Sequence, residues 1–113
     1  MKPEINKNLY DVLVSIDSIN DYFGEKKDFE TFRNDKKLKR AIEREIEIIG
    51  EAINRVTKQE PDIIIENSRR IIDTRNWVIH GYDKVDDIIL WGIIVNHLPK
   101  LKEEVVRILK MEE

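Results

Sequence analysis

The spacing of apolar residues constrains the fold of this chain most, because such residues recur every three or four positions along most of it. That spacing lines one face of an α-helix, which has ~3.6 residues per turn. It is clearest in residues 9–23, where Gly24 provides a stop, and in residues 38–56. The second of these helices should end near Gln59, just before Pro61.

The segments that follow each long helix also show helical patterns. The polar stretch 25–35 should contain a short helical turn around its two phenylalanines. A third helix is predicted from roughly Ile63 to His80, with Gly81 in the position of a left-handed C-cap.

The last third of the chain should add two more helical segments. Asp86 or Asp87 is expected to begin a fourth segment that runs through Val95. Pro99 should break or kink the chain before a final amphipathic stretch over residues 101–109. No strand signal outlasts the helical alternative, so we predict an all-α fold, an antiparallel four-helix-bundle-like domain spanning residues 1–113.

Composition excludes several classes of site. The 113 residues contain no cysteine, so disulfides, thiolate zinc sites and cysteine nucleophiles are excluded. No apolar run approaches membrane-spanning length and no signal peptide is visible, so a soluble cytoplasmic protein is expected. The net charge of −3 gives no global attraction to nucleic acid, so any such binding must be local.

Arg75 is the anomaly of the third predicted helix, because it falls within that helix's apolar face. A charged side chain there must be paired or must line a cleft. Glu45, on the apolar face of its own helix, is a candidate structural partner. Beside the apolar face runs a polar stripe with helical spacing, in which Asn76 can reach His80. The apolar positions of this helix are Ile64, Ile65, Ile71, Ile72, Val78 and Ile79.

Residues 75–82 read Arg-Asn-Trp-Val-Ile-His-Gly-Tyr. This string resembles the R-N-x-x-x-H-x-Y signature of the HEPN superfamily, specifically its HepT-like branch. Residues 40–52 resemble the central helix of that family, and residues 89–101 resemble its C-terminal pattern. The resemblance covers most of the chain in collinear order.

The resemblance implies a metal-independent RNA endonuclease that needs no cofactor and acts as the toxin of a toxin–antitoxin pair. His80 would be the general acid or base, Arg75 would hold the scissile phosphate, and Asn76 would position the other two. Members of the family dimerise so that two motifs face one cleft. In HepT-like toxins the motif tyrosine, here Tyr82, is a target for AMP transfer by a minimal nucleotidyltransferase antitoxin.

A basic run from Arg33 to Arg44 is a second candidate surface for RNA. The candidate RNA contacts in this run are Lys36, Lys37, Arg40 and Arg44, although a solvated polar face is the commoner explanation. His97 has no second ligand at metal spacing and is interpreted as a surface or packing residue. Trp77 points away from the apolar face, which suggests a dimer or partner contact.

Two other functions remain open from the residues alone. The same fold could be a non-catalytic module in which Arg75 and His80 contact a nucleotide or a partner. It could also be a structural dimerisation domain in which Arg75 is locked to Glu45.

Overall fold

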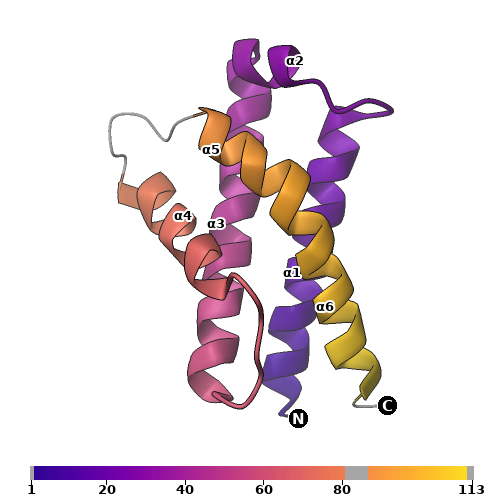
Figure 1. The fold of residues 1–113 in the computed structure, drawn as a ribbon, viewed down its shortest axis with the longest axis vertical. Coiled ribbons are helices and arrows are strands. Elements are labelled where there is room, and N and C mark those ends of the chain that lie inside the picture. The colour runs from indigo at the N-terminus through magenta and orange to yellow at the C-terminus, as the bar shows by residue number, and fades with distance from the viewer. Residues whose placement is uncertain (1, 81–86, 112–113) are drawn as a thin grey trace.

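The computed structural model describes residues 2–80 and 87–111, and every regular element in these ranges is helical. The predicted all-α antiparallel architecture is confirmed (Figure 1). In chain order the elements are α1 (Pro3–Phe23), α2 (Phe29–Asn34), α3 (Lys36–Gln59), α4 (Ser68–His80), α5 (Asp87–Gly92), the π-helical stretch η1 (Ile93–His97) and α6 (Leu98–Met111).

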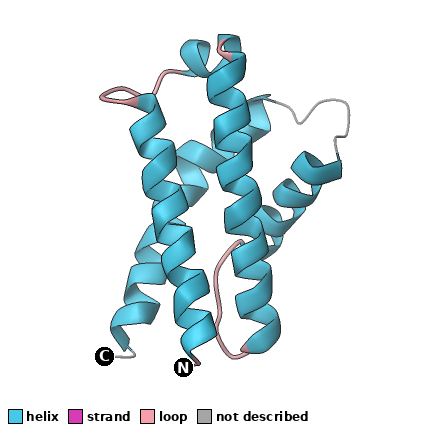
Figure 2. Cartoon of the chain, turned by 180° about the vertical axis from the view of Figure 1, so that it is seen from behind, coloured by secondary structure: helices cyan, strands magenta, loops and turns pink. Residues whose placement is uncertain are grey.

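The two longest helices, α1 and α3, run antiparallel side by side and form the centre of the bundle (Figure 2). Their facing sides carry most of the fully buried aliphatic residues, to which α6 adds Leu101 and Val105. Helix α4 packs on the opposite flank of α3. On α1 and α3 the buried aliphatic residues are Ile5, Leu9, Val12, Ile16, Ile19, Ile42, Ile46, Ile49, Ile53 and Val56.

The ends of the first three helices follow the signals in the sequence. Gly24 ends α1 with φ of +73°, a left-handed conformation that glycine adopts without steric cost. The Asp28 carboxylate caps α2 by accepting from the Thr31 N–H at 3.2 Å, and Asp35 caps α3 by accepting from the Leu38 N–H at 3.0 Å. The predicted short helix in the 25–35 stretch and the predicted end of α3 at Gln59 are confirmed.

Four aromatic rings pack together where α2 crosses the end of the bundle. Trp91 of α5 lies against Phe23, Phe29 and Phe32, with ring centroids 5.6–5.7 Å apart. This cluster ties the end of α1, the short α2 and α5 to one another.

The predicted start of the third helix is wrong, because α4 begins at Ser68 and not near Ile63. Asn67 adopts φ of +63°, which a right-handed helix does not permit, and its carbonyl accepts the N–H of Ile71. Ile64 is 82% exposed, whereas Ile65 is buried in the core from within the loop. The loop is therefore anchored by Ile65, with Ile63 packed against the core beside it, and the triplet 63–65 belongs to no helical face.

Pro99 does not break the chain, contrary to one of the two alternatives predicted for it. Helix continues from Asp87 to Met111, and Figure 1 shows that it changes direction along the way. The turn before Pro99 is π-helical, with the Leu98 N–H donating to the carbonyl of Ile93 five residues back. A proline lacks an N–H and its ring crowds the preceding turn, and this wider turn provides room for it.

Gly81, predicted as the C-cap of α4, lies outside the described residues. Within the described ranges, none of the helices combines the length and the apolar character that a membrane crossing requires.

Candidate functional site

Arg75 lies where α4 packs against α3, and Gly50 of α3 makes that position possible. Arg75 is half-buried and Gly50 is buried. A Cβ at position 50 would overlap the Cβ of Arg75, and it would lie 2.8 Å from the Arg75 Cγ and 3.2 Å from the carbonyl oxygen of Ile71. The absence of a side chain at Gly50 therefore sets how closely the backbone that carries Arg75 approaches α3.

The Arg75 guanidinium has no carboxylate partner in the described part of the chain. Its Nη1 donates to the Oδ1 of Asn76 at 2.8 Å, and its Nε is buried without a hydrogen-bond partner. An unpaired buried donor costs free energy unless a ligand satisfies it. The arginine thus retains capacity to bind an anion, and the amide oxygen of Asn76 orients one of its nitrogens.

The ion pair with Glu45 that would have made Arg75 a structural residue is not formed. Glu45 accepts instead from the hydroxyl of Tyr22 at 2.7 Å. That hydrogen bond, together with desolvation and the negative charge of Glu45, raises the pKa of Tyr22. Glu45 ties α3 to α1, on the side of α3 away from Arg75.

The polar stripe of α4 is formed as far as its side chains are described. Arg69 pairs with Asp73 one turn later, with Nε and Oδ1 3.5 Å apart. His80 is the last residue of α4, but its side chain and that of Trp77 lie outside the described side chains, as does all of Tyr82. The predicted contact of Asn76 with His80 therefore stays a prediction.

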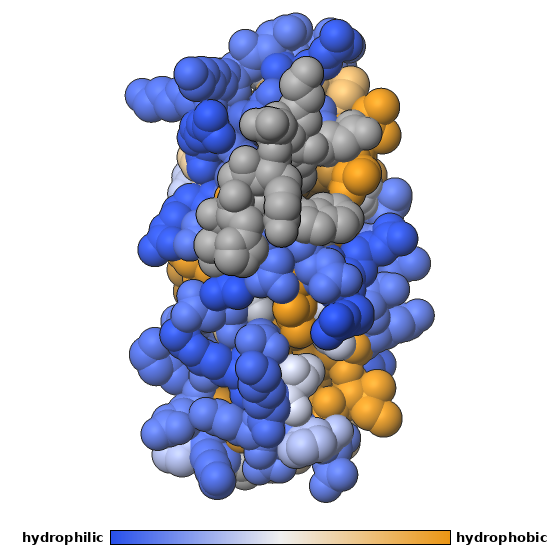
Figure 3. Space-filling model, turned by 90° about the vertical axis from the view of Figure 1, so that its left-hand side faces the viewer, coloured by the Kyte–Doolittle hydropathy of each residue, from blue (hydrophilic) through white to orange (hydrophobic). Residues whose placement is uncertain are grey.

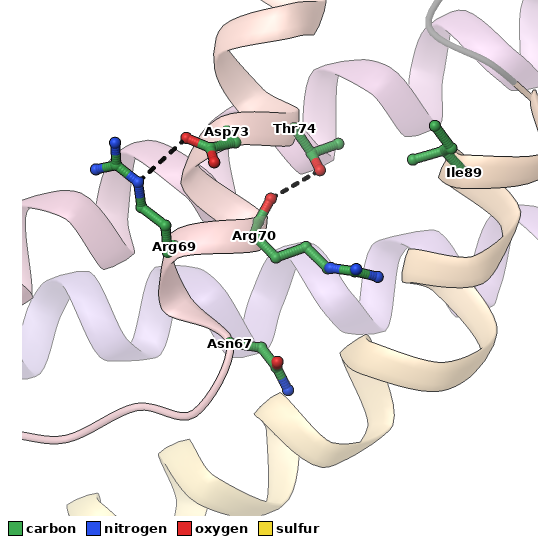
Figure 4. Close-up of a pocket in the computed structure, with 6 residues that line it drawn as sticks. All are labelled: Asn67, Arg69, Arg70, Asp73, Thr74 and Ile89. Atoms are coloured by element: carbon green, nitrogen blue, oxygen red, sulfur yellow. Dashed lines mark hydrogen bonds and ion pairs between the residues drawn. The ribbon is translucent and has the colours of Figure 1, made fainter.

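A groove of about 490 Å³ opens between α4 and α5 (Figure 4). In Figure 4, Arg69 and Asp73 lie together on one side of α4, whereas Arg70 extends across toward the helix that contains η1 and α6. There the Arg70 Nη1 lies 3.1 Å from the Nε2 of His97. The groove is lined by Asn67, Arg69, Arg70, Asp73, Thr74 and Ile89.

His97 is half-buried beside Arg70, so its interpretation as a surface or packing residue was incomplete. Desolvation lowers the pKa of His97, and the positive charges of Arg70 and Lys100 lower it further. The neutral imidazole accepts from Arg70 through Nε2, while its Nδ1 is buried without a partner. Sequence reasoning missed this contact because only the π turn before Leu98 sets the direction in which His97 points.

The basic run before and within α3 is largely neutralised locally. Arg40 pairs with Glu43 at 3.2 Å and Arg44 with Glu47 at 3.1 Å, each three residues apart on an exposed face. Lys36 and Lys37 are exposed at the start of α3. The two arginine pairs are what a solvated helix face would show.

Among the side chains that the structure describes, no three histidine, aspartate or glutamate residues come together in a group able to hold a metal ion.

Comparison with known proteins identifies the family to which this chain belongs. The family described as Ribonuclease HepT-like matches residues 12–108. The chain belongs to the HepT-like family. The resemblance to the HepT-like family that the sequence predicted is thereby confirmed.

Several relatives align over nearly the whole chain. A protein of Methanocaldococcus jannaschii named as a candidate RNase is 34% identical over 92% of this chain and 95% of its own length. A second candidate RNase of the same organism is 33% identical over 96% of this chain and 94% of its own. A protein of Thermococcus cleftensis named as a probable ribonuclease HepT is 33% identical over 90% and 93%. No solved structure matches the chain.

Proposed function

We propose that this protein is a metal-independent RNA endonuclease whose reaction is carried out by Arg75, Asn76 and His80. The observation that carries the proposal is the state of Arg75, which lies half-buried against Gly50 with a buried, unpaired Nε and no carboxylate partner among the described residues. Membership of the HepT-like family and the names of the archaeal relatives support RNA as the substrate.

In the proposed reaction the 2′-oxygen of a ribose attacks the adjacent phosphorus, and the bond from phosphorus to the 5′-oxygen breaks. The products are a 2′,3′-cyclic phosphate and a 5′-hydroxyl. His80 accepts the proton of the 2′-hydroxyl, a role that suits an imidazole side chain. The Arg75 guanidinium donates to the phosphate oxygens, where negative charge builds in the transition state.

One histidine per motif cannot both accept a proton from the 2′-oxygen and donate one to the 5′-oxygen in a single step. We therefore include a homodimer in the proposal, in which a second copy of the motif supplies the second histidine. In the cell the protein would act as the cytoplasmic toxin of a pair with a nucleotidyltransferase antitoxin. Transfer of AMP to Tyr82 would add bulk and negative charge beside the cleft and so exclude RNA.

Incubation of the purified protein with total cellular RNA in EDTA tests this proposal, with His80→Ala as the matched variant. Cleavage by the wild type alone is expected. If protein with an unmodified Tyr82 leaves RNA intact, the fold serves as a nucleotide- or partner-binding module and the proposal fails. Equal cleavage by both proteins would remove His80 from the site.

Arg75→Lys separates a catalytic arginine from a structural one. Lysine keeps the positive charge and the methylene groups that pack on Gly50, but it loses the forked guanidinium. Cleavage should fall by roughly a hundredfold or more, the usual effect of removing a transition-state hydrogen-bond donor. The midpoint of urea unfolding should change little, whereas a structural arginine would lower the midpoint and leave cleavage by the folded fraction intact.

A further inference from the structure

The groove between α4 and α5 contains an arginine that no carboxylate neutralises. Arg69 is paired with Asp73, but Arg70 is exposed and, among the described residues, its guanidinium contacts only the imidazole of His97. Glu104, two turns beyond His97 on α6, is engaged elsewhere because it accepts the backbone N–H of Glu66 at 2.9 Å.

His97, the partner of Arg70, is itself a basic group and does not neutralise the charge of the arginine. Arg70 and Lys100 both lower the pKa of His97, so three basic side chains share this part of the surface. An anion bound between them would relieve that repulsion and would also allow His97 to become protonated. Arg70 and Lys100 are both exposed, so their cationic groups are free to donate to a phosphate oxygen beside the His97 imidazole.

The surroundings of the groove suit a nucleic acid backbone. Figure 3 shows the flank that carries α4 as largely hydrophilic, with hydrophobic side chains in view mainly along one edge. The exposed amide of Asn67 can bond to sugar oxygens, and the exposed side chain of Ile89 offers an apolar surface against which a ribose or base can pack. The Thr74 hydroxyl is already used, since it donates to the Arg70 carbonyl at 2.8 Å.

We propose that Arg70 and His97 form a second phosphate subsite, which holds the RNA backbone next to the Arg75–His80 motif. This inference rests on the proposed ribonuclease function and extends it. Arg70 precedes His80 by ten residues, about 15 Å along the axis of α4. Position 80 also falls on the same side of α4 as Arg69 and Asp73 by helical register. A strand that crosses the catalytic motif can continue along α4, so that a phosphate more than one nucleotide away lies in the groove.

RNA binding without cleavage tests the subsite. The probe is a short fluorescein-labelled RNA with a 2′-O-methyl group at every position, which removes the nucleophile. Affinity is measured by fluorescence anisotropy over a series of salt concentrations for the wild type, Arg70→Gln and Arg107→Gln. Arg107 is a matched control, because it is an exposed arginine on α6 for which no ion pair is found in the described ranges.

Arg70→Gln should weaken binding about tenfold, as expected for the loss of a charged hydrogen bond. The slope of log affinity against log salt should fall by about 0.7, the contribution of one phosphate contact in a single strand. Arg107→Gln should leave both quantities close to wild type. Equal effects of the two variants, or no RNA binding by the wild type, would overturn the subsite.

The imidazole of His97 gives a second readout by NMR. Saturating amounts of the same RNA should raise the pKa of His97 in the wild type, because bound phosphate offsets the charges of Arg70 and Lys100. An unchanged pKa in the RNA-bound protein would contradict the subsite. RNA binding that depends on Arg70 in a protein that cleaves no RNA would leave the subsite standing while the proposed function fails. If the wild type cleaves RNA and Arg70→Gln binds RNA as tightly as the wild type, the proposed function stands and the subsite is overturned.

Discussion

At the scale of single residues, the account depends on how Gly50 of α3 meets Arg75 of α4. The backbone carrying Arg75 approaches α3 so closely that a Cβ on residue 50 would overlap the Arg75 side chain. A methyl group there must push α4 outward or force Arg75 into another rotamer. Either change moves the guanidinium relative to the phosphate that it is proposed to hold.

Gly50→Ala should therefore lower the free energy of unfolding by about 1–3 kcal/mol, the usual cost of overpacking. It should also reduce RNA cleavage by at least about tenfold, since small displacements of a catalytic group are costly. Gly92→Ala is the matched control, because a Cβ at that helical glycine meets nothing within 4 Å. That variant should gain about 0.5–1 kcal/mol in unfolding free energy and keep its activity. Two variants of equal stability and activity would show that Gly50 has no positioning role.

His97 makes the stability of the protein sensitive to mild acid. Its pKa in the folded state lies below the ordinary value of 6.5, so the unfolded chain binds a proton more readily than the folded one. The stability that neutral His97 contributes is complete above pH 6.5 and is lost as the pH falls from there through the folded-state pKa.

The urea midpoint of the wild type should consequently fall between about pH 7.5 and about pH 5.5, and it should fall less in His97→Gln. Glutamine keeps an acceptor for Arg70 but cannot be protonated. Every other titrating group is common to the two proteins, so the difference between their pH profiles isolates His97. Parallel profiles would mean that the protonation of His97 is not coupled to folding.

The sequence alone singled out Arg75 as a candidate site residue, because a charged side chain on the apolar face of a helix must be paired or must line a cleft. It could not tell whether Arg75 pairs with Glu45, because both residues lie on apolar faces and only the packing of α1 shows that Glu45 belongs to Tyr22. The role of Gly50 was hidden for the same reason. The packing role of a glycine within a helix can be recognised only when the residue that faces it on the neighbouring helix is known.

At the scale of elements, a partly buried ion pair fastens α5 to α3. Lys39 Nζ lies 3.0 Å from Asp87, the first residue of α5, and the two side chains are only 25% and 30% exposed. Asp87 also lies in the first turn of α5, where a carboxylate complements the helix dipole. This pair fixes where the chain resumes its helical course after the motif.

A double-mutant cycle with Lys39→Met and Asp87→Asn should give a coupling energy of about 1 kcal/mol. The control cycle uses Lys7 and Asp11, an i,i+4 pair on the surface of α1 with side chains 76% and 41% exposed. Its coupling should be about 0.3 kcal/mol. Both cycles are measured by chemical denaturation. A coupling energy between Lys39 and Asp87 no larger than that of the control pair would show that their ion pair does not help to hold α5 on α3.

The helices that were predicted well are those whose ends carry local signals. Gly24, Asp28 and Asp35 stop or cap their helices through their own backbone or side chains, so the sequence nearby suffices. The start of α4 and the course around Pro99 depend on distant parts of the chain. Ile65 is held in the core and the Glu66 N–H is held by Glu104, so the loop ends at Asn67 for tertiary reasons.

At the scale of the whole molecule, the fold places two basic features on one flank of α3. Arg75 lies at the α3–α4 contact, and Arg70 extends from the next face of α4 into the groove beside α5. The single domain over residues 1–113, the homodimer and the modification of Tyr82 stay predictions. The dimer matters most, because the proposed reaction needs a histidine from each of two copies.

The most direct measurement of the central claim is cleavage of a short RNA at a mapped site, in EDTA, with and without a single 2′-deoxy substitution at that site. The account predicts that the all-ribose strand is cut to a 2′,3′-cyclic phosphate and a 5′-hydroxyl, and that the substituted strand remains intact. Cleavage of the 2′-deoxy strand, or products ending in a 5′-phosphate, would contradict a mechanism in which His80 activates the ribose 2′-hydroxyl.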